Sequence, residues 1–180
     1  MLREPIGGGI ELALATPQLA EEIYALIDAN RQWLGRWLPF VESTKTPADT
    51  RRFLKEQLCL LAEEKALTLA IFLNGRPVGL VGLNRVDAQN RVGYIGYWID
   101  ERAAGQGVMT RAAGRLVELA FEQFPLDRLE IHCATGNAAS CAVAGKLGFV
   151  REAVLRRAIR SHNHVDDRVI WGLLREEWRG

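Results

Sequence analysis

Residues 104–110 are the clearest candidate for chemistry in this sequence, and they read Ala104, Gly105, Gln106, Gly107, Val108, Met109 and Thr110. They follow an apolar stretch typical of a strand and precede a segment whose apolar residues recur with the period of a helix. A glycine turn at the start of a helix exposes unpaired backbone N–H groups and the positive end of the helix dipole. Glycine also lets an anion approach the main chain closely, because no Cβ obstructs it. The pattern therefore predicts a phosphate-binding turn.

The charges of the helix after this turn favour an anionic ligand. Its first turn carries neither Asp nor Glu, although acidic side chains normally stabilise that position. Arg111 and Arg115 occupy its polar face instead. An ordinary glycine turn leading into a core helix is the alternative interpretation.

The composition is that of one globular domain spanning residues 1–180. Hydrophobic residues make up 48% and charged residues 25% of the chain, and the formal net charge is +1. This charge argues against a nucleic-acid partner, and the lack of a long apolar run or apolar leader argues against a membrane partner or signal peptide. Three cysteines without C-x-x-C pairing favour a reduced, cytoplasmic protein. His162 and His164 have metal-like spacing but no evident third ligand, so we expect no metal.

Hydrophobic periodicity predicts a mixed α+β architecture. Strands are expected at 10–15, 68–73, 77–84, 92–99, 128–133, 152–160 and 165–174, and helices after Thr16, after Thr46, at 107–124 and after Asn137. Thr46 and Asp49 form a predicted capping box, and Phe53 and Leu54 are expected to face inward with Leu58 and Leu61. Residues 31–40 are predicted to form an irregular loop or a broken helix.

Two local features concern the sheet. Asn74-Gly75 is a strong hairpin signal, and Gly93 and Gly96 predict a bulge or a close backbone approach within their strand. The strand–helix–strand unit over 92–133 is expected to supply one parallel strand pair.

This element order resembles that of the GNAT acetyltransferases, and most closely their RimJ/RimL branch. The shared pieces are Asn30-x-x-Trp33-Leu34, Tyr94-Ile95-Gly96-Tyr97-Trp98, Gly105-Gln106-Gly107-Val108-Met109, Asn137 with Ser140, Gly148-Phe149, and Asp167 in the last hairpin. The resemblance implies a single α+β domain: a central mixed, mostly antiparallel sheet with a splayed parallel strand pair, flanked by helices. It also implies that acetyl-CoA is the co-substrate and that an amine accepts the acetyl group directly from the thioester.

The resemblance assigns cofactor-binding and catalytic roles. Main-chain groups near Trp98 and Ile99 and the turn from Ala104 to Thr110 would bind acetyl-CoA, with Asn137 on its pantetheine arm and Lys146 near its phosphates. Ser140 would protonate the leaving thiolate, because Ala144 stands where many members of the family carry a tyrosine. Plainer roles remain open: Asn137 as a helix cap, Lys146 as a solvated side chain and Ser140 as a small helix residue.

The general base stays open at this stage. RimL-like enzymes carry a glutamate where this chain has Ile159, and His132, Asp87 and Asp167 are the alternatives. Deprotonating an α-amine at pH 7 costs about 1 kcal/mol, whereas a lysine costs about 4.6 kcal/mol. A site without a strong base therefore favours an N-terminal amine over a lysine.

The acceptor is expected to lie against four side chains, namely Trp33, Trp37, Asn84 and Tyr94. Core packing is the alternative for both tryptophans. The apolar segment 33–40 further predicts a homodimer, as in many members of this branch.

Three functions are compatible with these observations. The first is acetylation of a protein N-terminal α-amine, as in ribosomal-protein N-terminal acetyltransferases. The second is acetylation of a small amine or antibiotic. The third is a catalytically silent acetyl-CoA-binding regulatory domain.

Overall fold

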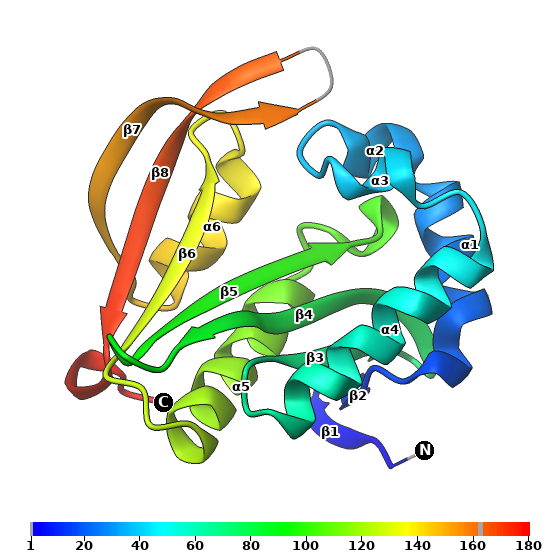
Figure 1. Ribbon diagram of the computed structural model, residues 1–180, viewed down its shortest axis with the longest axis horizontal. Helices are drawn as coiled ribbons and strands as arrows, with labels where there is room; N and C mark the ends of the chain where they lie inside the picture. Colours follow the sequence, from blue (N-terminus) through cyan, green and yellow to red (C-terminus); the bar gives the residue numbers. More distant parts are fainter. Residues whose placement is uncertain (1, 162–163) are drawn as a thin grey trace.

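The computed structural model describes residues 2–161 and 164–180, which form one sheet and its flanking helices (Figure 1). The strands are β1 (Glu4–Gly7), β2 (Ile10–Leu14), β3 (Leu67–Leu73), β4 (Arg76–Asp87), β5 (Val92–Ile99), β6 (Arg128–Ala134), β7 (Val150–Ser161) and β8 (His164–Leu174). The α-helices are α1 (Ala20–Ala29), α2 (Arg31–Gly35), α3 (Phe40–Ser43), α4 (Pro47–Ala62), α5 (Val108–Gln123) and α6 (Ala138–Lys146). Short 3₁₀ turns are η1 (Pro17–Leu19), η2 (Glu101–Ala103) and η3 (Arg175–Glu177).

The described strands form one sheet in the order β1-β2-β3-β4-β5-β6-β8-β7. The pairing is antiparallel except between β5 and β6, which are joined by the crossover helix α5. This confirms the predicted mixed sheet with one parallel pair. No described helix is long and apolar enough to cross a membrane.

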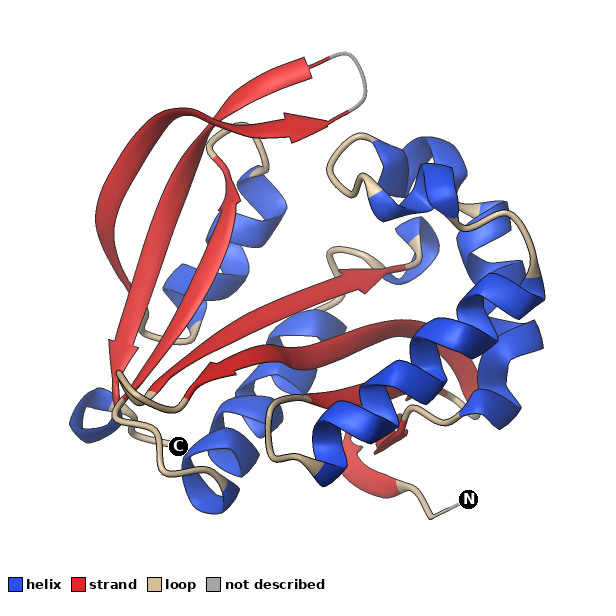
Figure 2. Ribbon diagram, viewed as in Figure 1, coloured by secondary structure: helices blue, strands red, loops and turns tan. Residues whose placement is uncertain are grey.

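The sheet buries a separate core on each of its two faces. Along β3, Leu69 and Ile71 join the core under α5, whereas Ala70 and Phe72 join the core under α1 and α4. This alternation follows from the two-residue period of a strand. Helices therefore cover both faces, as Figure 2 shows, and fix β4 and β5 in the middle of the fold.

β5 and β6 are paired only over the first half of β5. Their register runs from Val92 opposite Arg128 to Ile95 opposite Ile131. Beyond these positions the two strands diverge, and β6, β8, β7 and α6 swing away from the rest of the sheet (Figure 1). The second half of β5 thus presents backbone groups along the edge that faces β6.

Most predicted elements occur close to their predicted bounds. The capping box is present, since Asp49 N–H donates to Thr46 Oγ1 (3.3 Å) and Thr46 N–H donates to the Asp49 carboxylate (3.0 Å). Residues 31–40 form the short helices α2 and α3, consistent with a broken helix. β1 was not predicted, because four mostly exposed residues carry little apolar signal.

One predicted core residue is wrong. Phe53 is 41% exposed, whereas its neighbour Leu54 is fully buried. The helical period places Phe53 at the edge of the buried face of α4, where it borders the cavity described below.

The predicted hairpin at Asn74-Gly75 and the predicted close approach at Gly93 are both confirmed. Asn74 and Gly75 both adopt positive φ, at 50° and 78°, as a tight hairpin requires. Gly93 permits a close approach, since a Cβ there would lie 2.7 Å from the side chains of Leu129 and Leu83. The irregular register of this strand pair falls between Leu83 and Arg85 of β4. The turn predicted at His162 and Asn163 lies outside the described residues.

Candidate active site

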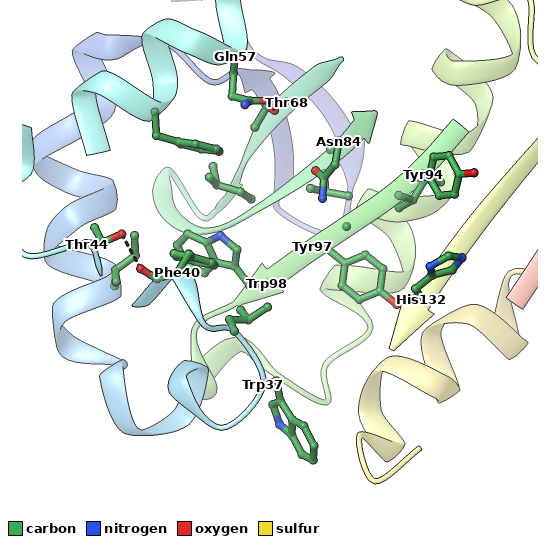
Figure 3. Close-up of a pocket in the computed structure, with 18 of the residues that line it drawn as sticks. Trp37, Phe40, Thr44, Gln57, Thr68, Asn84, Tyr94, Tyr97, Trp98 and His132 are labelled. Atoms are coloured by element: carbon green, nitrogen blue, oxygen red, sulfur yellow. Dashed lines mark hydrogen bonds between the residues drawn. The ribbon is translucent and has the colours of Figure 1, made fainter. Parts of the chain in front are cut away.

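A cavity of about 760 Å³ opens where β5 and β6 diverge. Its lining combines three layers: Trp37, Phe40 and Phe53 from the α2–α4 region, Asn84, Tyr94, Tyr97 and Trp98 from β4 and β5, and His132, Asn137 and Ser140 from beyond the splay. Figure 3 shows Asn84, Tyr94 and Trp98 on neighbouring strands, with Tyr97 directed toward the part of the chain that carries His132. The cavity therefore connects the predicted acceptor side with the predicted acid Ser140.

The glycine turn has the geometry that the sequence predicts. Gly105 and Gly107 adopt φ values of 75° and 78°, and Gly107 caps α5 without any side-chain hydrogen bond. A Cβ at either glycine would meet no described atom within 4 Å, so the requirement for glycine is conformational rather than steric.

The first N–H groups of α5 suit an anion. The first bond within α5 is donated by Arg111 N–H to the Gly107 carbonyl (3.1 Å), and helix geometry leaves the N–H groups before it without intrahelical acceptors. Val108 and Met109 bury their side chains and thereby anchor this turn. The first turn of α5 contains no acidic residue. A phosphate can therefore bind here through main-chain donors alone.

Lys146 lies at a different part of the surface from the main cavity. It is exposed near the end of α6 and lines a second hollow of about 750 Å³, together with Thr110 and Arg111 of α5. The cationic side chains of Lys146 and Arg111 thus line one hollow beside the start of α5, which is compatible with the predicted contact between Lys146 and the cofactor phosphates.

Ser140 forms a hydroxyl pair with Tyr97. The two oxygens lie 3.0 Å apart, and the Tyr97 hydroxyl also lies 3.2 Å from the Ser140 carbonyl oxygen. Burial raises the pKa of Tyr97, although the hydrogen bond with Ser140 opposes this shift. Tyr97 therefore stays protonated, and when it donates to Ser140 Oγ the serine proton is left for another acceptor. This arrangement can deliver a proton to a leaving group.

Asn137 holds the start of α6 in place. Its side-chain Oδ1 accepts a hydrogen bond from Ser140 N–H (3.1 Å), which confirms the predicted helix cap. Tyr97 was not predicted as a site residue. The strand period places it on the opposite face from Tyr94 and Trp98, but the sequence does not reveal that Ser140 lies opposite its hydroxyl.

Cys133 lines the cavity and lies beside Cys141, with which it forms no disulfide. Their sulfur atoms are 3.6 Å apart, and Cys133 is buried. Burial raises the pKa of the Cys133 thiol to about 12. Cys133 is therefore a neutral thiol at physiological pH.

The predicted acceptor side of the cavity is lined by aromatic side chains from the helical layer. Trp37 reaches toward the loop before α6, since a Cβ on Gly136 would lie 3.5 Å from its ring. Phe40 is 37% exposed and packs beside Trp98, with ring centroids 6.5 Å apart. Trp37 and Phe40 thus border the opening of the cavity.

Trp33 occupies a different position from Trp37. Its indole N–H donates to the Ile99 carbonyl (3.2 Å), and its ring packs against the core under α1 and α4. Trp33 thus ties α2 to the end of β5, and its predicted contact with the acceptor stays a prediction.

Asn84 and Tyr94 both reach the cavity. Asn84 lies at the register shift of β4, and its amide occupies the space that a Cβ on Gly96 would need. The Arg85 guanidinium lies 4.0 Å from the Tyr94 ring centroid. The tyrosine is thereby held between β4 and β6, on which His132 meets its ring.

The candidates for the general base occupy unlike positions. Ile159 lines the cavity but offers no proton acceptor. Asp87 accepts two hydrogen bonds from Asn90 in a turn, and Asp167 accepts from Arg157 N–H (2.7 Å). His132 lines the cavity. Among the described residues no cluster of His, Cys, Asp or Glu could hold a metal ion.

The arrangement fits a long anionic thioester such as acetyl-CoA. Beyond Ile95 and Ile131 the facing edges of β5 and β6 are not paired with each other, and Trp98 and Ile99 belong to this part of β5. The N-terminus of α5 supplies donors for phosphates, and the Ser140 hydroxyl lies in the cavity between the diverging strands.

Comparison with known proteins identifies the class of this fold and site. The acetyltransferase (GNAT) domain model matches residues 10–150, so the chain belongs to the GNAT acetyltransferase family. It is an acetyl-CoA-dependent N-acetyltransferase, and its relatives are of the RimL/RimJ type.

Two curated relatives cover nearly the whole chain. YdaF of Bacillus subtilis, provisionally named a ribosomal N-acetyltransferase, is 34% identical over 95% of this chain and 94% of its own length. The ribosomal-protein-serine acetyltransferase of Escherichia coli is 28% identical over 90% of each chain.

Two solved structures with bound ligands share the fold. RimL, a ribosomal alpha-N-protein acetyltransferase in complex with coenzyme A, has a TM-score of 0.91 at 25% identity and covers 96% of this chain and 98% of its own. The microcin self-immunity acetyltransferase MccE, in complex with acetyl-CoA and AMP, has a TM-score of 0.88 at 28% identity over 94% of each chain.

Proposed function

We propose that the protein acetylates the N-terminal α-amine of a protein, with a ribosomal protein as the favoured class of acceptor. One observation carries this proposal: a single cavity joins the Ser140 hydroxyl to an opening bordered by Trp37 and Phe40. An extended chain terminus can enter such an opening while the rest of its protein stays outside. The ribosomal acceptors named for RimL and the Escherichia coli relative support the same class.

In this proposal each part of the site has one task. Acetyl-CoA supplies an acetyl group already activated as a thioester. The turn from Gly105 to Thr110 binds its phosphates, and main-chain groups of Trp98 and Ile99 hold its pantetheine arm and orient its carbonyl. Ser140, hydrogen-bonded to Tyr97, donates a proton to the departing sulfur.

A small amine is the second candidate acceptor. The cavity volume lies in the range typical of small-molecule sites. MccE, which shares the fold, contains AMP beside acetyl-CoA. A compact acceptor held wholly inside the cavity would suit this alternative.

Acetyl-CoA turnover with mass spectrometry distinguishes the candidates. Peptides with free N-termini, polyamines, aminoglycosides and aminoacyl nucleotides are offered side by side at pH 7. The proposal predicts that N-terminal peptides give the highest kcat/KM, by at least tenfold. Preference for a small amine would support the second candidate, and the absence of thiol release with every amine of the panel would favour a silent acetyl-CoA-binding domain.

Two further expectations belong with this proposal. An acceptor on a bacterial ribosome would be met in the cytoplasm, as the relatives suggest. We also expect a homodimer, because Phe40 of the apolar segment 33–40 leaves apolar surface exposed.

A further inference from the structure

We propose that His132, positioned by Glu130, is the general base that deprotonates the acceptor amine. The proposal rests on the acetyl transfer proposed above and applies to any amine acceptor. It assigns a role to a pair of side chains on β6.

His132 lies where the base of such a reaction is needed. It follows Ile131, the last residue of β6 that pairs with β5, and therefore lies at the opening of the splay. Its side chain is 29% exposed and lines the cavity together with Ser140 and Trp37. An amine held in this cavity would share it with both the imidazole and the Ser140 hydroxyl.

Glu130 fixes the orientation of the imidazole. Its Oε2 lies 2.6 Å from His132 Nε2. Because a carboxylate accepts, the hydrogen bond assigns the proton of the neutral ring to Nε2 and leaves the lone pair on Nδ1. The ring also forms a T-shaped contact with Tyr94, with centroids 5.6 Å apart and an interplanar angle of 83°. The ring is therefore held on two sides.

Glu130 is itself held by a cation. Arg128 Nε donates to Glu130 Oε1 (2.8 Å), and the same guanidinium binds Glu152 on β7. One carboxylate oxygen of Glu130 thus binds arginine and the other binds histidine. With a side chain only 16% exposed, Glu130 has little freedom to turn away.

The other groups considered as bases are worse placed. Ile159 lines the same cavity but has no basic atom, and Asp87 is engaged by Asn90 in a turn. Asp167 accepts the Arg157 N–H. His132 is thus the one of these groups that combines a basic atom with a place on the cavity wall.

His132 Nδ1 takes one proton from the ammonium form of the acceptor, which frees the lone pair of its nitrogen. The nitrogen forms a bond to the acetyl carbon, the carbon–sulfur bond breaks, and the sulfur receives the Ser140 proton. The acetylated nitrogen passes its second proton to the Ser140–Tyr97 pair, which restores the serine hydroxyl, and the imidazolium returns its proton to solvent. The products are an acetylated amine, coenzyme A and one proton.

The pH dependence of this step depends on the charges around the ring. On the sheet these are Arg85 of β4, Tyr94 of β5, Arg128 and Glu130 of β6, Glu152 of β7 and Arg168 of β8. Across the cavity, α4 contributes Asp49, Arg52 and Glu56. Glu130 is the charged group that hydrogen-bonds directly to the imidazole, so Glu130→Gln is the sharpest perturbation.

The test is a pH–rate profile with the best acceptor of the panel, for the wild type and for His132→Gln, Glu130→Gln and Asp87→Asn. His132→Gln is expected to lower kcat at pH 7 by about 10²-fold with less than a twofold change in acetyl-CoA affinity by calorimetry. Its rate should keep rising through pH 8, as the free amine deprotonates unaided. Glu130→Gln should lower kcat by about tenfold without raising KM, and Asp87→Asn should match the wild type.

Chemical rescue distinguishes a lost base from a damaged fold. Added imidazole should restore part of the activity of His132→Ala at fixed pH, and should leave the wild type unchanged. An unchanged kcat and pH profile for His132→Gln would overturn the role of His132 while leaving acetyl transfer to the amine intact. A wild type that acetylates no amine would contradict both proposals.

Discussion

The two ends of the active site are built in different ways. The proposed phosphate-binding turn is made of backbone: two glycines with positive φ and the N-terminus of α5. The acceptor side is made of side chains from separate elements, such as Trp37 before α3, Tyr94 on β5 and His132 on β6. The first end can recognise the same cofactor with few specific side chains, whereas the second can change its acceptor through single substitutions.

Gly107→Glu tests the backbone end and should have the largest effect. A glutamate would strain the backbone at φ 78° and place a carboxylate where the anion binds. Calorimetry should detect no binding of coenzyme A. Gly107→Asn is the matched control, since asparagine tolerates this conformation, and it should keep affinity within about tenfold. A folded Gly107→Glu protein with wild-type affinity would contradict a phosphate site in this turn.

Ser140→Ala tests the junction between the two ends. Loss of the hydroxyl next to Tyr97 should lower kcat by roughly 10- to 10⁴-fold, with little change in acetyl-CoA affinity. Tyr97→Phe should give a smaller loss, because the serine would keep its own proton. Equal kcat values in Ser140→Ala and wild type would remove the serine from the reaction.

Trp37→Ala tests the side-chain end. Loss of the ring beside Gly136 should raise KM for a peptide acceptor by about tenfold and leave the affinity for acetyl-CoA unchanged. Trp33→Phe tests separately whether Trp33, which packs against the helical core and binds the Ile99 carbonyl, also contributes to acceptor binding. A larger effect on acetyl-CoA affinity than on the acceptor KM would show that the two ends are not separable.

Thiol labelling compares the buried Cys133 of the cavity wall with the exposed Cys59 on α4. Burial raises the pKa of the Cys133 thiol to about 12, so only about one molecule in 10⁴ carries the reactive thiolate at pH 8. Iodoacetamide at pH 8 should label exposed Cys59 long before Cys133, as peptide mass spectrometry can record. Similar labelling rates would mean that the cavity wall at Cys133 opens readily.

The sequence predicts features that depend on neighbouring residues in the chain. The glycine turn, the capping box of Thr46 and Asp49, and the Asn137 cap each involve residues within about one helical turn, so their chemistry is visible locally. The amphipathic period of α5 likewise reports its buried face.

Features that depend on distant contacts were missed for a physical reason. The Tyr97–Ser140 pair joins residues 43 positions apart, and Phe53 borders a cavity whose other walls are strands. Glu130 and His132 are close in sequence, but their proposed catalytic role depends on the position at which β6 diverges from β5. That position is set by the pairing of whole strands rather than by any local pattern.

Acetyl transfer to an α-amine rather than to a lysine is tested most directly by one peptide that carries both. At pH 7 the neutral α-amine is favoured by about 3.5 kcal/mol, a factor of several hundred in rate if nothing else differs. Intact-mass analysis and fragmentation of a peptide with a free N-terminus and an internal lysine would locate the acetyl group. The predicted result is acetylation of the N-terminus, with the lysine unmodified at early times. Acetylation mainly on the lysine would contradict it.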